Sequence, residues 1–131
     1  MHSNDMHSLV VSPEISRILA VEAEAALPNE AVGLLGGRHN HATLVLPLPN
    51  LAGPRAFFAD PYAQYLALQR LKEEGLDLVA TYHSHPGGGI LPSSTDFEFA
   101  RLWNCPQLII ALARPNLPGV EIGIYDSRDA I

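Results

Sequence analysis

The sequence predicts a single α/β domain in which helices flank a mixed β-sheet. A chain of 131 residues suffices for one domain with one hydrophobic core. With 47% hydrophobic and 17% charged residues, its composition is typical of a folded globular protein. Segments with helical hydrophobic spacing alternate with short apolar runs, in the order helix, hairpin, helix, strand, helix, strand, strand. This alternation favours a sheet that is covered by helices.

The first half of the chain is expected to form a helix and a hairpin. Ser12 and Pro13 are the residue types of a helix N-cap and first turn, and the helix should end at Leu27 because the next residue is proline. Two apolar runs joined at "GGRHNH" then predict a hairpin from about Glu30 to Leu48. Pro47 in its second arm indicates an edge strand.

A second helix and a long strand are expected next. Asp60 followed by proline repeats the capping signature, and Gly75 should end this helix. The segment "LDLVATYHSH" is almost continuously apolar, which suits a strand covered on both faces. A third helix is expected from Asp96 to about Trp103, because Thr95 and the acidic residue three positions later have the spacing of a capping box.

Two more strands are expected after the third helix. "QLIIALA" is apolar after its first residue and predicts a buried strand, and "VEIGIYD" alternates so that Val120, Ile122 and Ile124 would share one face. No repeat or linker interrupts the chain. Residues 9–131 are therefore expected to form the domain, and residues 1–8 a flexible N-terminus.

Charge, hydropathy and cysteine content exclude several classes of protein. A net charge of -6 with eight Lys plus Arg offers no basic footprint for nucleic acid. The apolar runs are far shorter than the roughly 20 residues that cross a bilayer. No secretory signal is visible, so a cytoplasmic location is expected. Cys105, the single cysteine, excludes an internal disulfide and a Cys-rich zinc site, and it is expected to be a packed thiol.

The stretch "HSHPGGGILPSSTD" has the residue types of a metal site. Side chains two apart on a strand point the same way, so His83 and His85 would present two imidazoles on one side of a strand end. Asp96 begins the predicted helix beyond a loop, Pro86 with Gly87–Gly89, that can turn sharply. Two nitrogens and one carboxylate leave a fourth tetrahedral position for water, which is the pattern of a catalytic zinc.

The spacing alone leaves a second interpretation equally open. An acidic residue such as Asp96 in a first helical turn is stabilised by about 0.3–1 kcal/mol through the helix dipole without any metal. A histidine pair at a strand end is often polar surface. His39 and His41 are also one residue apart, but they lie in the predicted hairpin turn and are expected to be exposed there. His2 and His7 belong to the N-terminal segment.

Hydrolysis of a peptide bond at a zinc ion also requires a general base outside the ligand set. Glu30 is the candidate, because "PNEAVGLLGG" places one acidic side chain at the start of an otherwise apolar strand. The alternative is a solvent-facing strand terminus, since glutamate is rarely buried unless it is paired.

These residues together resemble a known family. His83-Ser84-His85-Pro86, six residues, Ser93, two residues and Asp96 match the His-x-His-Pro-x6-Ser-x-x-Asp signature of the JAMM metalloproteases, the catalytically competent MPN-plus domains. "PNEAVGLLGG" is similar to that family's first strand, which carries a glutamate. The resemblance extends from the first helix to the last strand, and it implies the JAMM/MPN fold, which is cytidine deaminase-like.

The resemblance implies a role for each matched residue. His83, His85 and Asp96 would bind one Zn²⁺ per chain, Glu30 would be the acid/base that activates the zinc-bound water, and Ser93 would donate to the developing oxyanion. The family cleaves peptide or isopeptide bonds next to the C-terminal Gly-Gly of ubiquitin or ubiquitin-like proteins. No room is found after Asp96 for an insertion that grips ubiquitin chains. The chain therefore resembles the compact stand-alone prokaryotic type, which acts on ubiquitin-like sulfur-carrier proteins.

Three other functions compete with this hypothesis. A zinc deaminase would need a His-x-Glu motif and a Cys-x-x-Cys pair, which one cysteine excludes. A non-catalytic MPN-type interaction scaffold generally lacks the metal ligands, whereas all of them are present here. A zinc hydrolase of small amides stays open. The loop Gly87–Gly89 permits either a mobile flap or a plain tight turn.

Overall fold

The computed structural model of the chain describes residues 8–53, 56–93, 103–112 and 120–126. All the helices and strands predicted within these ranges are present. They are α1 (Pro13–Ala26), β1 (Val32–Arg38), β2 (His41–Leu48), α2 (Pro61–Glu73), β3 (Asp77–His85), β4 (Gln107–Leu112) and β5 (Val120–Tyr125). The expected third helix lies outside the described residues apart from Trp103, and so do Asp96 and residues 1–7.

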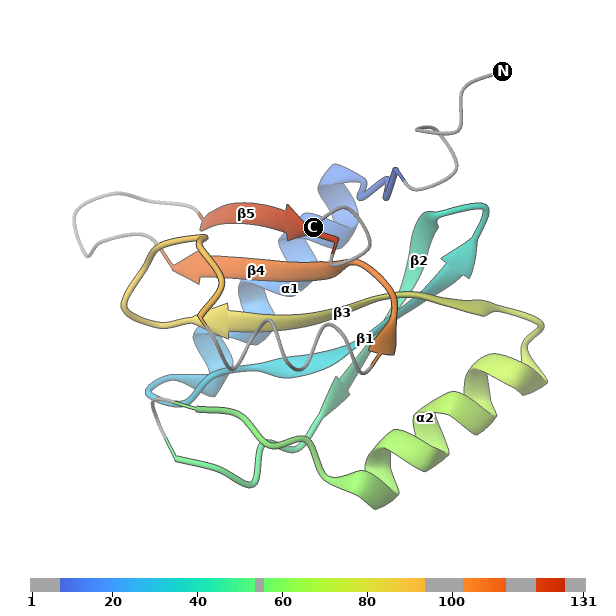
Figure 1. Ribbon diagram of the computed structural model, residues 1–131, viewed down its shortest axis with the longest axis horizontal. Coiled ribbons are helices and arrows are strands. Elements are labelled where there is room, and N and C mark those ends of the chain that lie inside the picture. Colours follow the sequence, from blue (N-terminus) through green and yellow to red (C-terminus); the bar gives the residue numbers. More distant parts are fainter. Residues whose placement is uncertain (1–7, 54–55, 94–102, 113–119, 127–131) are drawn as a thin grey trace.

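The five strands form one mixed sheet in the order β2-β1-β3-β4-β5 (Figure 1). β1 pairs antiparallel with both β2 and β3, β3 pairs parallel with β4, and β4 pairs antiparallel with β5. The predicted α/β fold class is therefore confirmed. β2 is an edge strand, as Pro47 indicates. Three segments meet at the same end of the strands (Figure 1): the start of β1, the end of β3 and the connection that follows β2.

The β1–β2 hairpin turns at two residues with positive φ. His39 has φ 53° and Asn40 has φ 64°, which is the left-handed backbone that a two-residue hairpin turn with the twist of the flanking strands requires. Gly37 is needed beside this turn, because a Cβ there would collide with the backbone carbonyl of His41. His39 and His41 are exposed, as expected for turn residues.

Both helices begin at the predicted caps. The Ser12 hydroxyl accepts a hydrogen bond from the N–H of Ile15 at 3.2 Å, and the Asp60 carboxylate accepts one from the N–H of Tyr62 at 3.0 Å. α1 ends at Ala26, where the following residue no longer has helical backbone. Among the described residues, no helix combines the length and the apolar character that crossing a membrane requires.

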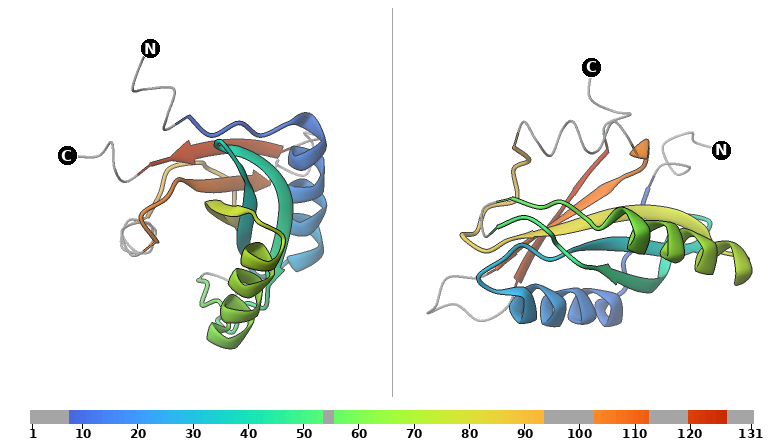
Figure 2. Two further views of the ribbon diagram at one scale, coloured as in Figure 1. Left: turned by 90° about the vertical axis from the view of Figure 1, so that its right-hand side faces the viewer. Right: turned by 90° about the horizontal axis from the view of Figure 1, so that it is seen from below.

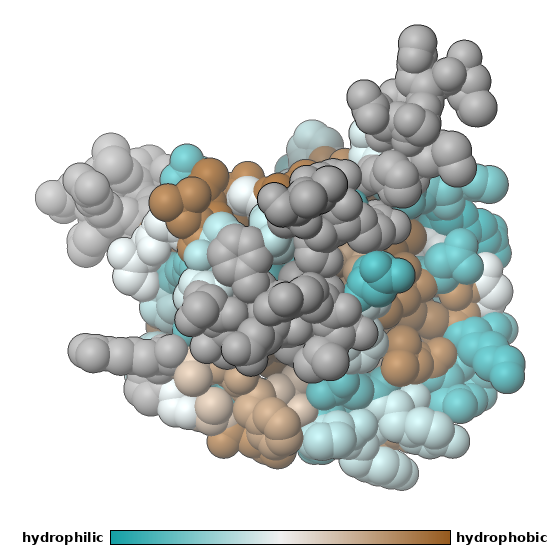
Figure 3. All heavy atoms as spheres, viewed as in Figure 1, coloured by the Kyte–Doolittle hydropathy of each residue, from teal (hydrophilic) through white to brown (hydrophobic). Residues whose placement is uncertain are grey.

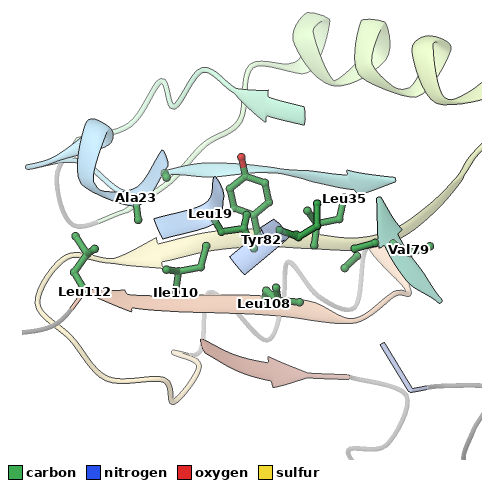
Figure 4. Packing of buried hydrophobic residues seen from close by; sticks show 12 residues of the cluster. Leu19, Ala23, Leu35, Val79, Tyr82, Leu108, Ile110 and Leu112 are labelled. Atoms are coloured by element: carbon green, nitrogen blue, oxygen red, sulfur yellow. The ribbon is translucent and has the colours of Figure 1, made fainter. Parts of the chain in front are cut away.

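The two helices cover opposite faces of the sheet (Figure 2). α1 packs on the first core cluster, whose side chains converge between helix and sheet (Figure 4). The cluster consists of Ile15, Leu19, Ala23, Ala31, Leu35, Ala42, Val79, Ala80, Tyr82, Leu108, Ile110 and Leu112. α2 packs on the second cluster, which consists of Val32, Leu34, Leu46, Leu48, Ala59, Ala67 and Leu71. The strands in the middle of the sheet are thus buried on both faces.

The outer strand β5 departs in part from its expected pattern. Val120 and Ile122 pack against the first core cluster, but Ile124 is 52% exposed. Alternation predicts which side of a strand a residue faces, whereas burial also requires a neighbour that covers it. One end of this edge strand has no such cover within the described part of the chain, so Ile124 is exposed there.

Candidate metal centre

β3 delivers the two predicted histidine ligands to the face of the sheet that α2 covers. Val32 of the second core cluster pairs with His83, so His83 and His85 point to this face. His83 is fully buried, and its ring stacks on Phe57 with centroids 4.6 Å apart and an interplanar angle of 21°. His83 is therefore not polar surface, which removes the simpler interpretation of this strand end.

The two imidazoles converge on one point. His83 Nε2 and His85 Nε2 are 3.1 Å apart. In a tetrahedral zinc site with Zn–N distances of about 2.0–2.1 Å, two ligating nitrogens lie about 3.3 Å from one another. The observed separation thus fits two ligands of one zinc ion.

Hydrogen bonding fixes the tautomer of His85. Its Nδ1 lies 2.8 Å from the carbonyl oxygen of Gly89. A carbonyl can only accept, so Nδ1 carries the proton and Nε2 of the neutral ring presents its lone pair toward His83. A ligating histidine that donates its other N–H to a carbonyl is the usual arrangement at metal sites.

The glycine loop after β3 is attached to His85 at two points. Besides the bond to Gly89, the N–H of Gly88 donates to the His85 carbonyl at 3.0 Å. Gly88 and Gly89 have φ of 88° and 89°, which L side chains rarely adopt. These residues therefore make a turn that holds the His85 side chain, and glycine is needed at two of the three loop positions.

The predicted third ligand cannot be placed, because Asp96 lies outside the described residues. Within the described ranges, no three His, Cys, Asp or Glu side chains come together. Ser93 is described and is exposed, shortly after the glycine loop. The structure brings two of the predicted ligands together, and every metal-ligand and catalytic assignment stays a prediction.

Glu30 is buried two residues before the start of β1. Only 9% of it is exposed, so a solvent-facing strand terminus is wrong. The Ser84 N–H donates to the carbonyl of Ala31 at 2.9 Å, which continues the β1–β3 pairing beyond Val32. One residue further, this register places Glu30 opposite His85 and on the same face of the sheet.

A pocket of about 290 Å³ opens next to Glu30, where the end of α1 meets the start of β1 and the end of β2. It is lined by Glu22, Ala25, Ala26, Asn29, Glu30, Ala31, Val32, Pro47, Leu48 and Asn50. Leu51 and Phe58, on the connection between β2 and α2, are more than half exposed. Hydrophobic side chains gather at the surface over this connection (Figure 3). Glu30 thus lines a pocket, and two large apolar side chains are exposed on the connection that carries Phe57.

Two parts of the site could not be found from the sequence. Phe57 lies in the segment "LAGPRAFFA", which predicts only a connection, and nothing local indicates that it stacks on His83. Asn50 follows Pro47 and Pro49 and is a residue type typical of turns. In the structure, however, its side chain donates a hydrogen bond to the Glu30 carbonyl. Cys105 is buried, as predicted for a packed thiol.

Comparison with known proteins decides the family. Residues 12–121 match the family described as prokaryotic homologs of the JAB domain. The chain belongs to this family. The predicted resemblance to the prokaryotic JAMM proteins is therefore confirmed, and the chain is a hydrolase of this class.

Named relatives of the chain support this assignment. A probable TtuB-protein conjugate cleaving protease of Thermus thermophilus is 44% identical over 109 residues, covering 79% of this chain and 71% of the relative. A desampylase of Pyrococcus furiosus is 30% identical over 106 residues, covering 79% and 74%. The solution structure of a protein from Desulfitobacterium hafniense has a TM-score of 0.76 at 32% identity, covering 91% of this chain and 89% of the other.

Proposed function

We propose that this chain is a zinc-dependent protease that hydrolyses peptide or isopeptide bonds next to the C-terminal Gly-Gly of a ubiquitin-like or sulfur-carrier protein. The observation that carries the proposal is the convergence of His83 Nε2 and His85 Nε2 at 3.1 Å, with Glu30 buried on the neighbouring strand segment. Two ring nitrogens and a nearby carboxylate outside the ligand set are what hydrolysis at a catalytic zinc requires.

Three residues would hold the zinc ion, with one ion in each chain. His83 and His85 would bind through Nε2, and Asp96 is proposed as the carboxylate ligand on the strength of the sequence motif. When bound, zinc supplies a Lewis acid and lowers the pKa of water to about 7. The Gly89 carbonyl keeps the proton of His85 on Nδ1, so that Nε2 stays available as a ligand.

Glu30 and Ser93 would move protons and stabilise charge. The Glu30 carboxylate would accept a proton from the attacking water and deliver it to the leaving amine, because a peptide nitrogen leaves only when protonated. The Ser93 hydroxyl would donate to the oxygen on which negative charge develops. A donor of this kind typically contributes roughly 3 kcal/mol to transition-state stabilisation.

The proposed substrate class follows from the relatives and from the chemistry of the tail. One relative is named for cleaving TtuB-protein conjugates and another is a desampylase. Glycine allows a backbone to lie close to a buried reaction centre such as the histidine pair. The exposed Leu51 and Phe58 offer an apolar surface at the edge of the site that a protein substrate could cover.

Incubation with defined substrates tests the proposal. The zinc-loaded protein is mixed with TtuB conjugates and with ubiquitin-like carriers that are extended beyond their Gly-Gly end by a short peptide. Release of the extension, which a chelator abolishes and Glu30→Gln prevents, is the expected result. Cleavage that persists after complete removal of zinc, or in Glu30→Gln, would contradict the proposed mechanism.

A further inference from the structure

The peptide group between Glu30 and Ala31 is held at both ends by side chains. Its carbonyl oxygen accepts a hydrogen bond from Asn50 Nδ2 at 2.9 Å. Its N–H donates to the hydroxyl of Ser84 at 2.7 Å, in a buried contact. Peptide groups at a sheet are usually held by neighbouring backbone. Here the placement of the group that carries Glu30 depends on two particular side chains.

Ser84 connects this peptide group to the strand that carries the histidines. It stands between His83 and His85, and its side chain points to the opposite face of the sheet. It is fully buried, and its own N–H donates to the Ala31 carbonyl at 2.9 Å. The hydroxyl therefore attaches the residue after Glu30 to β3 without contributing to the metal-facing side.

Asn50 uses all four hydrogen-bonding positions of its amide. Nδ2 donates to the carbonyls of Glu30 at 2.9 Å and Ala56 at 3.1 Å. Oδ1 accepts from the N–H groups of Ala52 at 2.9 Å and Phe58 at 3.0 Å. An amide offers two donors and two acceptor lone pairs, so this set is complete.

The bonds of Asn50 tie Glu30 to a loop that contacts His83. The loop is closed by the N–H of Leu51, which donates to the carbonyl of Phe58 at 2.8 Å. It carries Phe57, whose ring stacks on His83. A single side chain thus sets the position of the Glu30 carbonyl and of the aromatic residue that packs on His83.

We propose that Asn50 and Ser84 are positioning residues that hold Glu30 in place for proton transfer. The proposal rests on the proposed function, in which Glu30 is the acid/base. Proton transfer requires the carboxylate to lie within about 2.6–3.2 Å of its partner. Glu30 lies two residues before the start of β1, and the two hydrogen bonds that hold the Glu30–Ala31 peptide group come from side chains. A misplacement of about 1 Å lowers a rate by about 100-fold.

Asn50→Asp separates the two tasks of Asn50. It keeps the acceptor positions that bond to Ala52 and Phe58 and removes the donors to Glu30 and Ala56. In the zinc-loaded chain, with a ubiquitin-like carrier extended by a peptide as substrate, kcat should fall by about 100-fold while KM and the zinc content stay unchanged. Ser84→Ala should show the same division between kcat and KM.

Gln64→Ala is the matched control. Gln64 Nε2 donates to the carbonyl of Ala59 at 3.0 Å, which is an amide-to-carbonyl bond at the far end of the same connection with no bond to Glu30. Its kcat should equal that of the wild-type chain. An unchanged kcat in folded, zinc-loaded Asn50→Asp would overturn the proposal. Loss of zinc or of the folded state together with activity would also overturn it, because the residue would then be structural.

Amide hydrogen exchange tests the same contact without any activity. The N–H of Ala31 should be protected in the wild-type chain and in Gln64→Ala, and it should exchange faster in Ser84→Ala, since its acceptor is gone. An Ala31 amide that is unprotected in the wild-type chain would refute the positioning role. Retained cleavage in Glu30→Gln would instead refute the proposed function, so the two failures are distinguishable.

Discussion

Replacing Gly89 by alanine should weaken zinc binding without changing either histidine. Gly89 has φ 89°, and a Cβ at this position would meet no atom within 4 Å. The penalty is therefore conformational rather than steric, and for an L residue it amounts to about 1–2 kcal/mol. The carbonyl of the same residue accepts the hydrogen bond from His85 Nδ1 at 2.8 Å. A loop that relaxes to relieve the strain would lose this bond.

The energy of the backbone strain and the energy of the His85–Gly89 hydrogen bond together predict how the loop responds to the substitution. Hydrogen-bond partners of metal-ligating histidines contribute about 10–100-fold to metal affinity, which corresponds to about 1.4–2.7 kcal/mol. This contribution is similar to the backbone strain, so we expect the loop of Gly89→Ala to relax in part. Zinc affinity should then fall by about 10-fold. Competition titration against a fluorescent zinc chelator measures this change, and thermal unfolding of the metal-free chain measures the strain that remains.

The neighbouring glycines are matched controls. At Gly87 a Cβ would lie in open space and φ is not positive, so Gly87→Ala should change neither zinc affinity nor stability. Gly88 has φ 88°, and its carbonyl has no bond to His85, so Gly88→Ala should lower stability and keep most of the zinc affinity. Equal zinc affinities for Gly88→Ala and Gly89→Ala would refute the role assigned to the Gly89 carbonyl.

Three further changes test other parts of the structure. Glu30→Gln should keep its zinc and lower kcat by about 10²–10⁴-fold; zinc analysis beside steady-state kinetics checks this, and an active variant would contradict it. Phe57→Leu should lower zinc affinity by about 2- to 10-fold, because an aromatic pair such as the one with His83 contributes about 0.5–1.5 kcal/mol; an unchanged titration would exclude a role for the stack. The Tyr82 hydroxyl is buried and has no hydrogen-bond partner within the described residues, so Tyr82→Phe should raise the free energy of urea unfolding by about 1 kcal/mol. Burial, and to a lesser extent the charge of Glu22, raises the pKa of Tyr82. The stability of the wild-type chain should therefore fall above pH 10, the unfolded-state pKa being about 10, by up to about 1.4 kcal/mol per pH unit. An equally steep fall in Tyr82→Phe would show that Tyr82 is not its cause.

Local sequence patterns sufficed for most of the fold. Ser12 and Asp60 are side-chain caps in the structure, as their types and the prolines after them predict. The apolar run before His83 is the buried central strand β3, because a strand covered on both faces needs hydrophobic residues at successive positions. The period of two along that strand places His83 and His85 together, and the structure shows their nitrogens 3.1 Å apart.

Contacts between distant segments could not be predicted in this way. The β1–β3 register places Glu30 opposite His85, yet the sequence indicates only that Glu30 begins an apolar strand. The side chains of Asn50 and Phe57 reach the site through a connection without regular structure, where no periodicity shows which way a residue points. The exposure of Ile124 likewise depends on which elements cover the edge of the sheet.

The zinc content of the purified protein is the most direct test of the central claim that His83 and His85 are metal ligands. Elemental analysis of the wild-type chain should find about one zinc ion per chain, as expected for a single catalytic site. The same analysis should find none in His85→Ala that remains folded. A wild-type chain that is folded and stays free of zinc after the ion is supplied would contradict the account.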